Sequence, residues 1–483
     1  MRRFGTIWLF FGAAALGCAG ASESEAQADT ATAGQDSTPP GDTQTADIPE
    51  DTVESPDLTL PDTTTPEDAL AADTLPPAPA CDPSLPAIVM AHGFLASGDT
   101  WGPHAMRFIE NGWCPDHLVA FDWNTITSFA GGDNEAAIGD LDDLITATLA
   151  RTERAQLVLI GHSAGGGLAV EYLGDPERAK QVQKYIHVGS GLIDAPPGGV
   201  AMLNLSSKGD AVIGKKGEIP GATNVMLETE DHFGVATSAA SFRAMATFIL
   251  GTAPEVDAIV PEGPIEISGR GVAFGDNSPA AGAVVAVWPV DPETGAREGE
   301  QPAHEVTLDD QGRYGPLAIE PNTPYELEIS GVGSVDVHYY HAAFVRSHPL
   351  LYLRTLPGPD DGLAGGLLAN VPFTKDSATL VAFESSHGYL AGQDTLKLDG
   401  VELLTETLAS AKKTLIALFL YDGDADETTQ GEPITLFDGF PFLGARDTTL
   451  PAGGTSVLEY GDRRVAFQRW AGVPDGAIIV IFD

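Results

Sequence analysis

The chain has few basic residues. Lysine and arginine together number 25, against 69 aspartates and glutamates, and the formal net charge at pH 7 is −44. A surface of this sign repels phosphate backbones and anionic headgroups. The composition therefore argues against nucleic acid as a partner, whereas it does not disfavour the binding of uncharged substrates.

Cysteine is also scarce, with three in 483 residues. Cys81 and Cys114 remain once the N-terminal Cys18 is set aside, and two thiols are too few for a structural zinc cluster. In an exported chain they form a natural pair, so we expect a disulfide near the start of the first folded domain.

No hydrophobic run is long enough to cross a membrane. The longest N-terminal one, residues 7–16, follows Met1-Arg2-Arg3 and ends before a small residue and Cys18, which predicts a signal peptide over residues 1–18. Ala15-Leu16-Gly17-Cys18 resembles a bacterial lipoprotein box, and this implies lipidation of Cys18 and anchorage to the cell envelope, at the outer membrane or cell surface. Ala15 departs from the usual leucine, so an ordinary cleaved signal and secretion stay open.

Residues 19–80 contain neither lysine nor arginine and almost no aromatic side chain. A tract of Thr, Pro, Ala, Asp and Glu cannot bury enough apolar surface to fold. We expect a disordered, extended linker.

The apolar run Leu157–Ile160 leads into Gly161-His162-Ser163-Ala164-Gly165. A buried strand that turns sharply at a serine before a helix holds the hydroxyl out of the sheet, and flanking glycines let neighbouring backbone pass. Ser163 is therefore a candidate nucleophile.

A serine hydroxyl needs a histidine base, and a carboxylate must orient that base. His232 is the histidine that follows Ser163 in a loop, between a strand-like and a helix-like segment, whereas the others precede Ser163, lie in turns or strands, or fall in the β-rich region after residue 251. In the α/β-hydrolase order the acid lies between serine and histidine, after a strand. Asp210 fits this position, and Asp194 remains the alternative acid.

Donors for the oxyanion are expected from two places. The apolar strand Ala87–Met90 breaks at His92-Gly93-Phe94, where this fold supplies one backbone N–H, and the residue after the nucleophile supplies the other. Phe94 and Ala164 are the predicted donors. Side chains that could line an apolar acyl pocket nearby are Phe94, Leu95, Trp101, Phe129 and Phe233.

The order of these features predicts an α/β-hydrolase catalytic domain over residues 81–256. Within it, Ile138, Leu141, Ile145 and Leu149 recur at helical spacing between acidic residues. They predict an amphipathic helix that covers one face of the sheet rather than a moving lid.

The chain from residue 87 to 483 resembles a group of archaeal and bacterial serine lipases and esterases whose hydrolase domain precedes a β-rich lipid-binding region. The segments that carry the resemblance are Met106-Arg107-Phe108 with Asn111-Gly112, the Ser163 turn, Ala222-Thr223-Asn224-Val225, Val337-His338-Tyr339-Tyr340, and Ala343-Phe344-Val345-Arg346. The resemblance implies lipase or esterase activity on acyl esters, without a cofactor, through Ser163, His232 and an acid.

Two departures from that group matter. Those lipases carry a sizeable lid insertion before the nucleophile, whereas only residues 122–149 fill that place here. They can also place the acid directly after the strand that follows the nucleophile helix, where this chain has Ser190 and Gly191. Asp194, which follows shortly after, therefore remains the alternative catalytic acid.

After residue 256 short strands alternate with Gly, Pro and Asp turns. We expect two C-terminal β-sandwich-like domains. The first, residues 257–332, looks like the small transthyretin or carboxypeptidase-regulatory sandwich. The second is a β-rich domain over residues 333–483. By resemblance this region binds lipid or docks on the catalytic mouth, and a purely stabilising role is the alternative.

Asp422, Asp424 and Asp426 alternate, as carboxylates do at the start of a calcium loop, but the glycine and distal glutamate of a full loop are missing. A solvated acidic turn is the favoured interpretation, and no metal is expected in the active site.

These observations together predict a serine carboxylic-ester hydrolase that acts on acylglycerol-type esters. A hydrolase of polyesters or other bulky esters and a catalytically silent, surface-anchored binding protein are the alternatives.

Overall fold

The computed structural model describes residues 75–129 and 132–482. The predicted signal peptide, Cys18 and the linker up to residue 74 lie outside the described residues, as does the side chain of Phe129. The described residues belong to one compact unit. In the described ranges no helix combines the length and apolarity that crossing a membrane requires.

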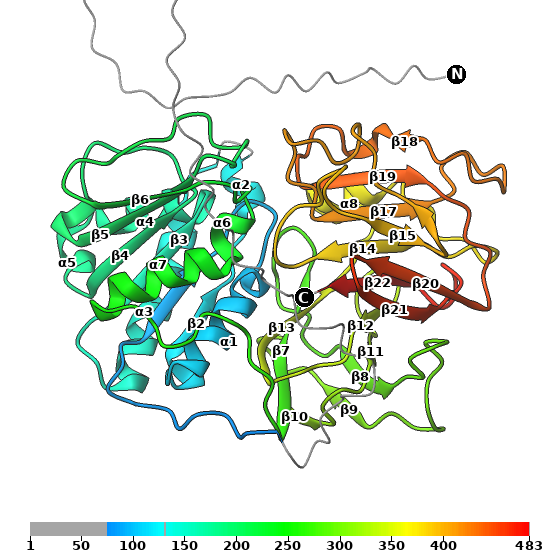
Figure 1. Cartoon of the computed structure of the whole chain (residues 1–483), viewed down its shortest axis with the longest axis horizontal. Helices are drawn as coiled ribbons and strands as arrows, with labels where there is room; N and C mark the ends of the chain where they lie inside the picture. Colours follow the sequence, from blue (N-terminus) through cyan, green and yellow to red (C-terminus); the bar gives the residue numbers. More distant parts are fainter. Residues whose placement is uncertain (1–74, 130–131, 483) are drawn as a thin grey trace, which may run out of the picture. The chain divides into compact units, whose positions relative to one another are not determined.

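Six parallel strands form the first sheet, in the order β2-β1-β3-β4-β5-β6 (Figure 1). Their bounds are β1 Ile88–Ala91, β2 Leu118–Phe121, β3 Leu157–His162, β4 Val182–Val188, β5 Ala201–Ser207 and β6 Thr223–Leu227. β3 is central and buried along its whole length, as the apolar run predicts. Parallel strands need crossover connections, which are usually helical, and helices cover both faces of this sheet.

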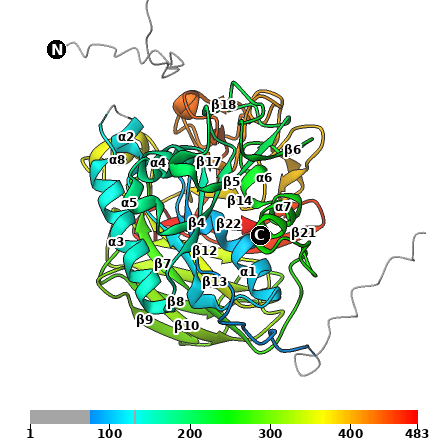
Figure 2. The same ribbon diagram turned by 90° about the vertical axis from the view of Figure 1, so that its left-hand side faces the viewer.

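The helices are α1 Gly102–Glu110, α2 Thr125–Phe129, α3 Glu135–Thr152, α4 Ala164–Leu173, α5 Pro176–Ala179, α6 Gly234–Thr237 and α7 Ala239–Leu250. Ile88 and Met90 of β1 pack in one core with α1 and α7, whereas Val89 and Ala91 pack in another with α3 and α4. Figure 2 shows the sheet between these two helix layers. Side chains that alternate along a strand thus fill two separate cores.

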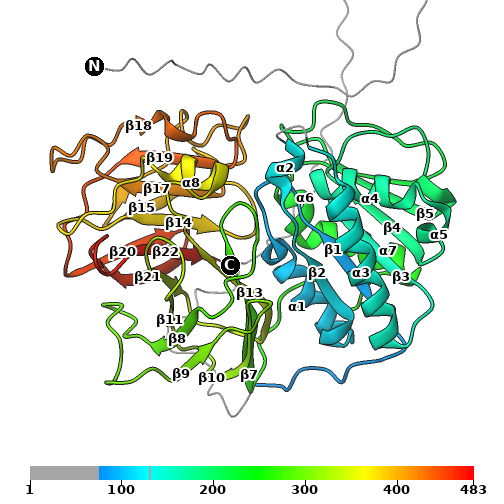
Figure 3. The same cartoon turned by 180° about the vertical axis from the view of Figure 1, so that it is seen from behind.

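The predicted amphipathic helix lies within α3, which Figure 3 shows in front of the sheet. Leu141 and Ile145 are fully buried, and Ile138 and Leu149 pack against the same core. The prediction of a packing helix is confirmed.

As far as the structure describes it, the C-terminal region is built of strands, with one α-helix, α8 at Gly362–Leu368, and a 3-10 helix at Thr435–Phe437. The bounds are β7 Ile265–Ala273, β8 Val284–Pro289, β9 His304–Thr307, β10 Arg313–Ile319, β11 Tyr325–Ser330, β12 Val337–His341, β13 His348–Thr355, β14 Leu380–Glu384, β15 Leu396–Leu398, β16 Val401–Glu402, β17 Ala417–Tyr421, β18 Pro433–Ile434, β19 Leu443–Asp447, β20 Thr455–Tyr460, β21 Arg463–Gln468 and β22 Ala477–Phe482. They form sheets of three, nine and four strands.

The nine-stranded sheet has the order β18-β19-β17-β14-β22-β12-β11-β8-β9. This sheet contains strands from both sides of the expected domain boundary between residues 332 and 333. β11, before the boundary, pairs antiparallel with β12, after it. β7 likewise pairs with β13 in the three-stranded sheet. The C-terminal region is β-rich, as expected, but that boundary passes through sheets rather than between them.

One buried and two partly buried arginines join the C-terminal region to the hydrolase domain. Arg346, with a side chain 1% exposed, contacts Glu110 of α1 at 2.8 Å. Arg354 of β13 contacts Asp99 at 2.7 Å, and Arg270 of β7 pairs with Asp122 after β2. Charges removed from water are stable only when paired, so these contacts fix the two regions against each other.

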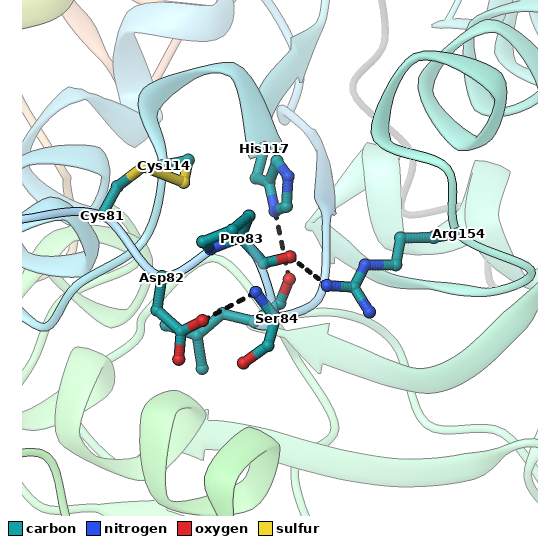
Figure 4. Close-up of a disulfide and its surroundings, with 8 residues drawn as sticks. Cys81, Asp82, Pro83, Ser84, Cys114, His117 and Arg154 are labelled. Atoms are coloured by element: carbon teal, nitrogen blue, oxygen red, sulfur yellow. Dashed lines mark hydrogen bonds between the residues drawn. A yellow bond between two sulfur atoms is a disulfide. The ribbon is translucent and has the colours of Figure 1, made fainter.

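Cys81 and Cys114 form a disulfide with their Cα atoms 4.7 Å apart (Figure 4). The segment before β1 is further bound by Asp82 N–H, which donates to Gly112 O at 2.7 Å. The disulfide therefore attaches the entry of the hydrolase domain to the loop after α1.

Candidate active site

Ser163 occupies the turn between β3 and α4 with φ 52° and ψ −117°. This backbone conformation is costly for a residue with a side chain and persists only where the surroundings impose it. A Cβ on Gly161 would lie 2.5 Å from Gly165 O, and one on Gly165 would lie 2.5 Å from Ala91 O. The two glycines therefore let α4 approach the ends of β3 and β1, and the Ser163 hydroxyl stands out from the turn.

Ser163, His232 and Asp210 form one hydrogen-bonded chain. His232 Nε2 lies 3.0 Å from Ser163 Oγ, and His232 Nδ1 lies 2.9 Å from Asp210 Oδ2. An ionised carboxylate only accepts, so the proton stays on Nδ1 and Nε2 is left to accept from the hydroxyl. His232 and Asp210 are 2% and 1% exposed.

Asp210 follows β5 and is held at both oxygens. Its Oδ1 accepts from Val212 N–H at 2.8 Å and Ile213 N–H at 3.1 Å. Burial alone would raise the pKa of this carboxyl, but the bonds from His232 and from the two backbone groups lower the pKa below its ordinary value. Asp210 is thus kept ionised beside the imidazole.

The alternative acid is not brought to the histidine. Asp194 lies exposed in the loop after β4, while Nδ1 of His232 is bonded to Asp210. Asp231, the neighbour of His232, accepts from Phe233 N–H and Gly234 N–H at 2.9 and 2.7 Å. It shapes the histidine loop rather than the imidazole.

His162, next to the serine, supports the same loop. Its Nε2–H donates to His232 O at 2.9 Å, and the two rings lie 4.8 Å apart. Burial, with the nearby His232, lowers the pKa of His162 to about 3. His162 is therefore neutral and fixes the backbone of His232 without changing charge.

The turn expected to hold the oxyanion lies directly against the serine. A Cβ added to Gly93 would lie 3.2 Å from Ser163 Cβ and 3.0 Å from His162 Nδ1. The turn is closed by Ala96 N–H, which donates to Gly93 O at 3.3 Å. Phe94 belongs to this turn and Ala164 is the first residue of α4, so both predicted donors flank Ser163.

An apolar cavity adjoins His162 and His232. The hydrolase domain contributes Phe94, Leu95 and Phe233 to its lining, as predicted, whereas Trp101 lies in the core with α1. Phe442 stacks near His232, with ring centroids 5.8 Å apart. The C-terminal region supplies the larger apolar share: Phe274, Leu356, Leu368, Val381, Phe383, Ile416, Ala417, Phe419, Phe442, Leu443, Ile479 and Ile481.

These C-terminal lining residues are the part of the site that sequence reasoning missed. They come from β14, β17, β19, β22, α8 and connecting loops, and no local pattern distinguishes them from core residues. Only the pairing of distant strands brings them to the cavity.

The acidic turn lies on a different part of the chain. Ligand atoms of Asp422, Asp424 and Asp426 lie within 4.8 Å of one another. Gln430 Nε2 donates to Asp424 and Asp426 at 2.9 and 3.1 Å. The amide thus supplies a partner to these carboxylates.

A family model described as the lipase C-terminal domain matches residues 263–356, and a second, for another C-terminal domain, matches residues 383–466. No curated protein matches the chain.

Several solved hydrolase structures are similar to part of the chain. Lipase BlEst2 of Bacillus licheniformis is 16% identical, over 36% of this chain and 96% of its own, with a TM-score of 0.28. Carboxylesterase CesB of Bacillus subtilis is 11% identical, over 36% and 86%, with a TM-score of 0.26. The thioesterase domain of the curacin biosynthetic pathway is 16% identical, over 35% and 93%, with a TM-score of 0.26.

The geometry of the chain itself identifies the fold. A parallel sheet with a serine turn after its central strand, followed along the chain by a buried aspartate and then a histidine, is the α/β-hydrolase arrangement. The chain has the α/β-hydrolase fold, followed by a β-rich C-terminal region that contains a match to lipase C-terminal domains.

Proposed function

We propose that the protein is a serine carboxylic-ester hydrolase whose substrates carry an apolar acyl chain, as in acylglycerols. The observation that supports this most is the bonded chain Ser163–His232–Asp210 on a strained turn beside an apolar cavity. A base aligned on a hydroxyl, with a carboxylate behind it, suits nucleophilic attack on an acyl carbonyl.

The reaction proceeds in two halves. Ser163 Oγ attacks the ester carbon while its proton passes to His232 Nε2, and the N–H groups of Phe94 and Ala164 hold the oxyanion. The intermediate collapses when His232 returns the proton to the leaving alcohol, which leaves an acyl ester on Ser163. Water then attacks this ester, gives a proton to His232, and the carboxylic acid leaves as Ser163 Oγ regains that proton.

Hydrolysis of p-nitrophenyl esters from acetate to palmitate by residues 75–483 tests the proposal. Wild type should turn them over, and Ser163→Ala should reduce kcat by about 10⁶-fold. A folded protein without turnover, or equal turnover in the variant, contradicts it.

A substitution that fills part of the cavity tests whether the acyl chain binds there. Val381 on β14 lines it and is 5% exposed, so Val381→Phe should reduce turnover of long esters relative to short ones. Val401→Phe, at a position 60% exposed, is the control. An unchanged chain-length profile in Val381→Phe contradicts acyl binding there.

We also propose that the protein is exported and anchored by a lipid on Cys18. The disulfide Cys81–Cys114 supports an oxidising compartment. Labelling with a radioactive fatty acid should mark the wild type and not Cys18→Ser. Labelling of both, or of neither, contradicts the anchor.

A further inference from the structure

Asn277 of the C-terminal region reaches into the turn beside Ser163. It is 6% exposed, and its side-chain Nδ2 lies 2.9 Å from Ala96 O, 3.1 Å from Trp123 O and 3.2 Å from His92 Nε2. All three acceptors belong to the hydrolase domain. The amide thus bonds both ends of the segment His92–Ala96 that contains Phe94.

The loop that presents Asn277 is itself ordered. Asn277 has φ 61°, a left-handed conformation that asparagine tolerates better than most residues. Its N–H donates to Ala273 O at 3.1 Å, and Asp276 Oδ1 accepts from Ser278 N–H at 2.9 Å and from Ser278 Oγ–H at 2.8 Å. The side chain is therefore held in place before any substrate arrives.

The hydrogen-bond partners determine the orientation of the Asn277 amide and the tautomer of the His92 imidazole. Ala96 O and Trp123 O can only accept, so the NH₂ end of Asn277 faces them. His92 Nε2 is approached by this donor and by Trp123 N–H at 3.3 Å, so Nε2 must accept and the proton lies on Nδ1. Burial lowers the pKa of His92, which keeps the ring neutral in this tautomer.

The tautomer matters because of the bond on the other side of the ring. His92 Nδ1–H donates to Gly93 O at 2.8 Å. Gly93 C=O and Phe94 N–H belong to one planar peptide group and point in opposite directions. A bond that holds the carbonyl therefore also sets the direction of the Phe94 N–H.

We infer that Asn277 is a positioning residue for the oxyanion hole: it fixes the tautomer of His92 and the carbonyl of Ala96, and so aims the Phe94 N–H at the developing oxyanion. This inference rests on the proposed function and extends it. The C-terminal region then contributes to the chemical step as well as to the acyl cavity.

Asn277→Asp and Asn277→Gly are the test variants. Asp keeps the size and the tolerance for positive φ but replaces the donor with an acceptor, and Gly removes the side chain without backbone strain. Outright loss of an oxyanion donor costs about 10²–10³-fold in kcat. We expect each variant to lose about 10-fold or more in kcat for p-nitrophenyl butyrate, with KM nearly unchanged.

A transition-state readout separates positioning from general loosening. A straight-chain alkyl trifluoromethyl ketone forms an oxyanion adduct with an active-site serine, so its affinity should fall by the same factor as kcat. Arg346→Met is the control, because Arg346 joins the same two regions through Glu110, apart from the His92 turn, and also pairs with Glu262 of its own region. It should lower Tm and leave kcat and inhibitor affinity unchanged.

A double substitution tests the route through His92. If Asn277 acts through this ring, His92→Gln combined with Asn277→Asp should be little worse than His92→Gln alone. Unchanged kcat and inhibitor affinity in both Asn277 variants, or losses that Arg346→Met shares, overturn the inference while the proposed function stands. If the wild type shows no turnover that depends on Ser163, both the proposed function and the inference about Asn277 are contradicted.

Discussion

Asp210 holds the imidazole of His232 with one carboxylate oxygen, while two backbone N–H groups hold the other. The backbone bonds prevent the carboxyl from rotating, so the oxygen that faces Nδ1 is fixed. This arrangement determines which nitrogen of His232 carries the proton. It therefore determines whether Nε2 can take a proton from Ser163.

Asp210→Asn should reduce kcat by about 10⁴-fold because the amide would keep its oxygen on Val212 N–H and Ile213 N–H and turn its NH₂ toward Nδ1. The proton of His232 would then lie on Nε2, where it blocks the base. Steady-state kinetics with a short p-nitrophenyl ester check this. Asp194→Asn, at the exposed alternative position, should leave kcat unchanged, and a comparable loss there would contradict the assignment of the acid.

Loops rather than strands connect the catalytic histidine to the C-terminal region. Asp231 Oδ1 accepts from two N–H groups at the start of α6, and its Oδ2 accepts from Gly388 N–H at 2.5 Å. Thr237 Oγ1–H of α6 also donates to Ser386 O. The loop after β14 is thereby attached to the segment that carries His232.

Asp231→Asn should lower the free energy of unfolding by about 1–3 kcal/mol, because an amide NH₂ would face Gly388 N–H and leave a buried donor unsatisfied. Urea unfolding at pH 7 measures this, and Glu230→Gln is the neighbouring control. A stability equal to that of the control would show that this carboxylate does not hold the two loops together.

The disulfide acts on a different pair of elements, the entry to β1 and the loop after α1. It closes a sequence separation of 33 residues, so Cys81→Ser with Cys114→Ser should cost about 2–4 kcal/mol of unfolding free energy. Because Ser163 lies elsewhere, kcat should not change. Denaturation curves with and without reductant test this: reductant should destabilise the wild type and leave the variant unaffected.

For the whole molecule, buried neutral histidines link stability to pH. Burial lowers the pKa values of His92, His104 and His162, the last to about 3. These groups bind protons in the unfolded chain, near pH 6.5 and below, that they do not bind in the folded chain. Stability is therefore greatest above the unfolded pKa and falls as the pH decreases.

Between pH 6.5 and 4 the free energy of unfolding should fall, by at most about 1.4 kcal/mol per pH unit for each such histidine. His162→Gln removes one titrating group and keeps a donor for His232 O, so its stability should depend less steeply on pH over this range. Urea unfolding at several pH values measures the slopes. Equal slopes in wild type and variant would contradict a buried neutral His162.

The sequence by itself determined the features that depend on neighbouring residues. An apolar run ending in Gly-x-Ser-x-Gly predicts a turn at the serine, and the spacing of Leu141 and Ile145 predicts a helix face, because both depend on local backbone geometry. The chain order of serine, acid and histidine was equally accessible.

Tertiary structure decided what depends on distant segments. The sequence left Asp210 and Asp194 as alternative acids, and the structure shows that the carboxylate hydrogen-bonded to His232 is that of Asp210. The cavity lining, the sheet that crosses residue 332, and the bond between Asn277 and His92, which are 185 residues apart, also lay beyond local pattern. Hydrophobic periodicity specifies which face of a strand is buried but not which strand or loop covers it.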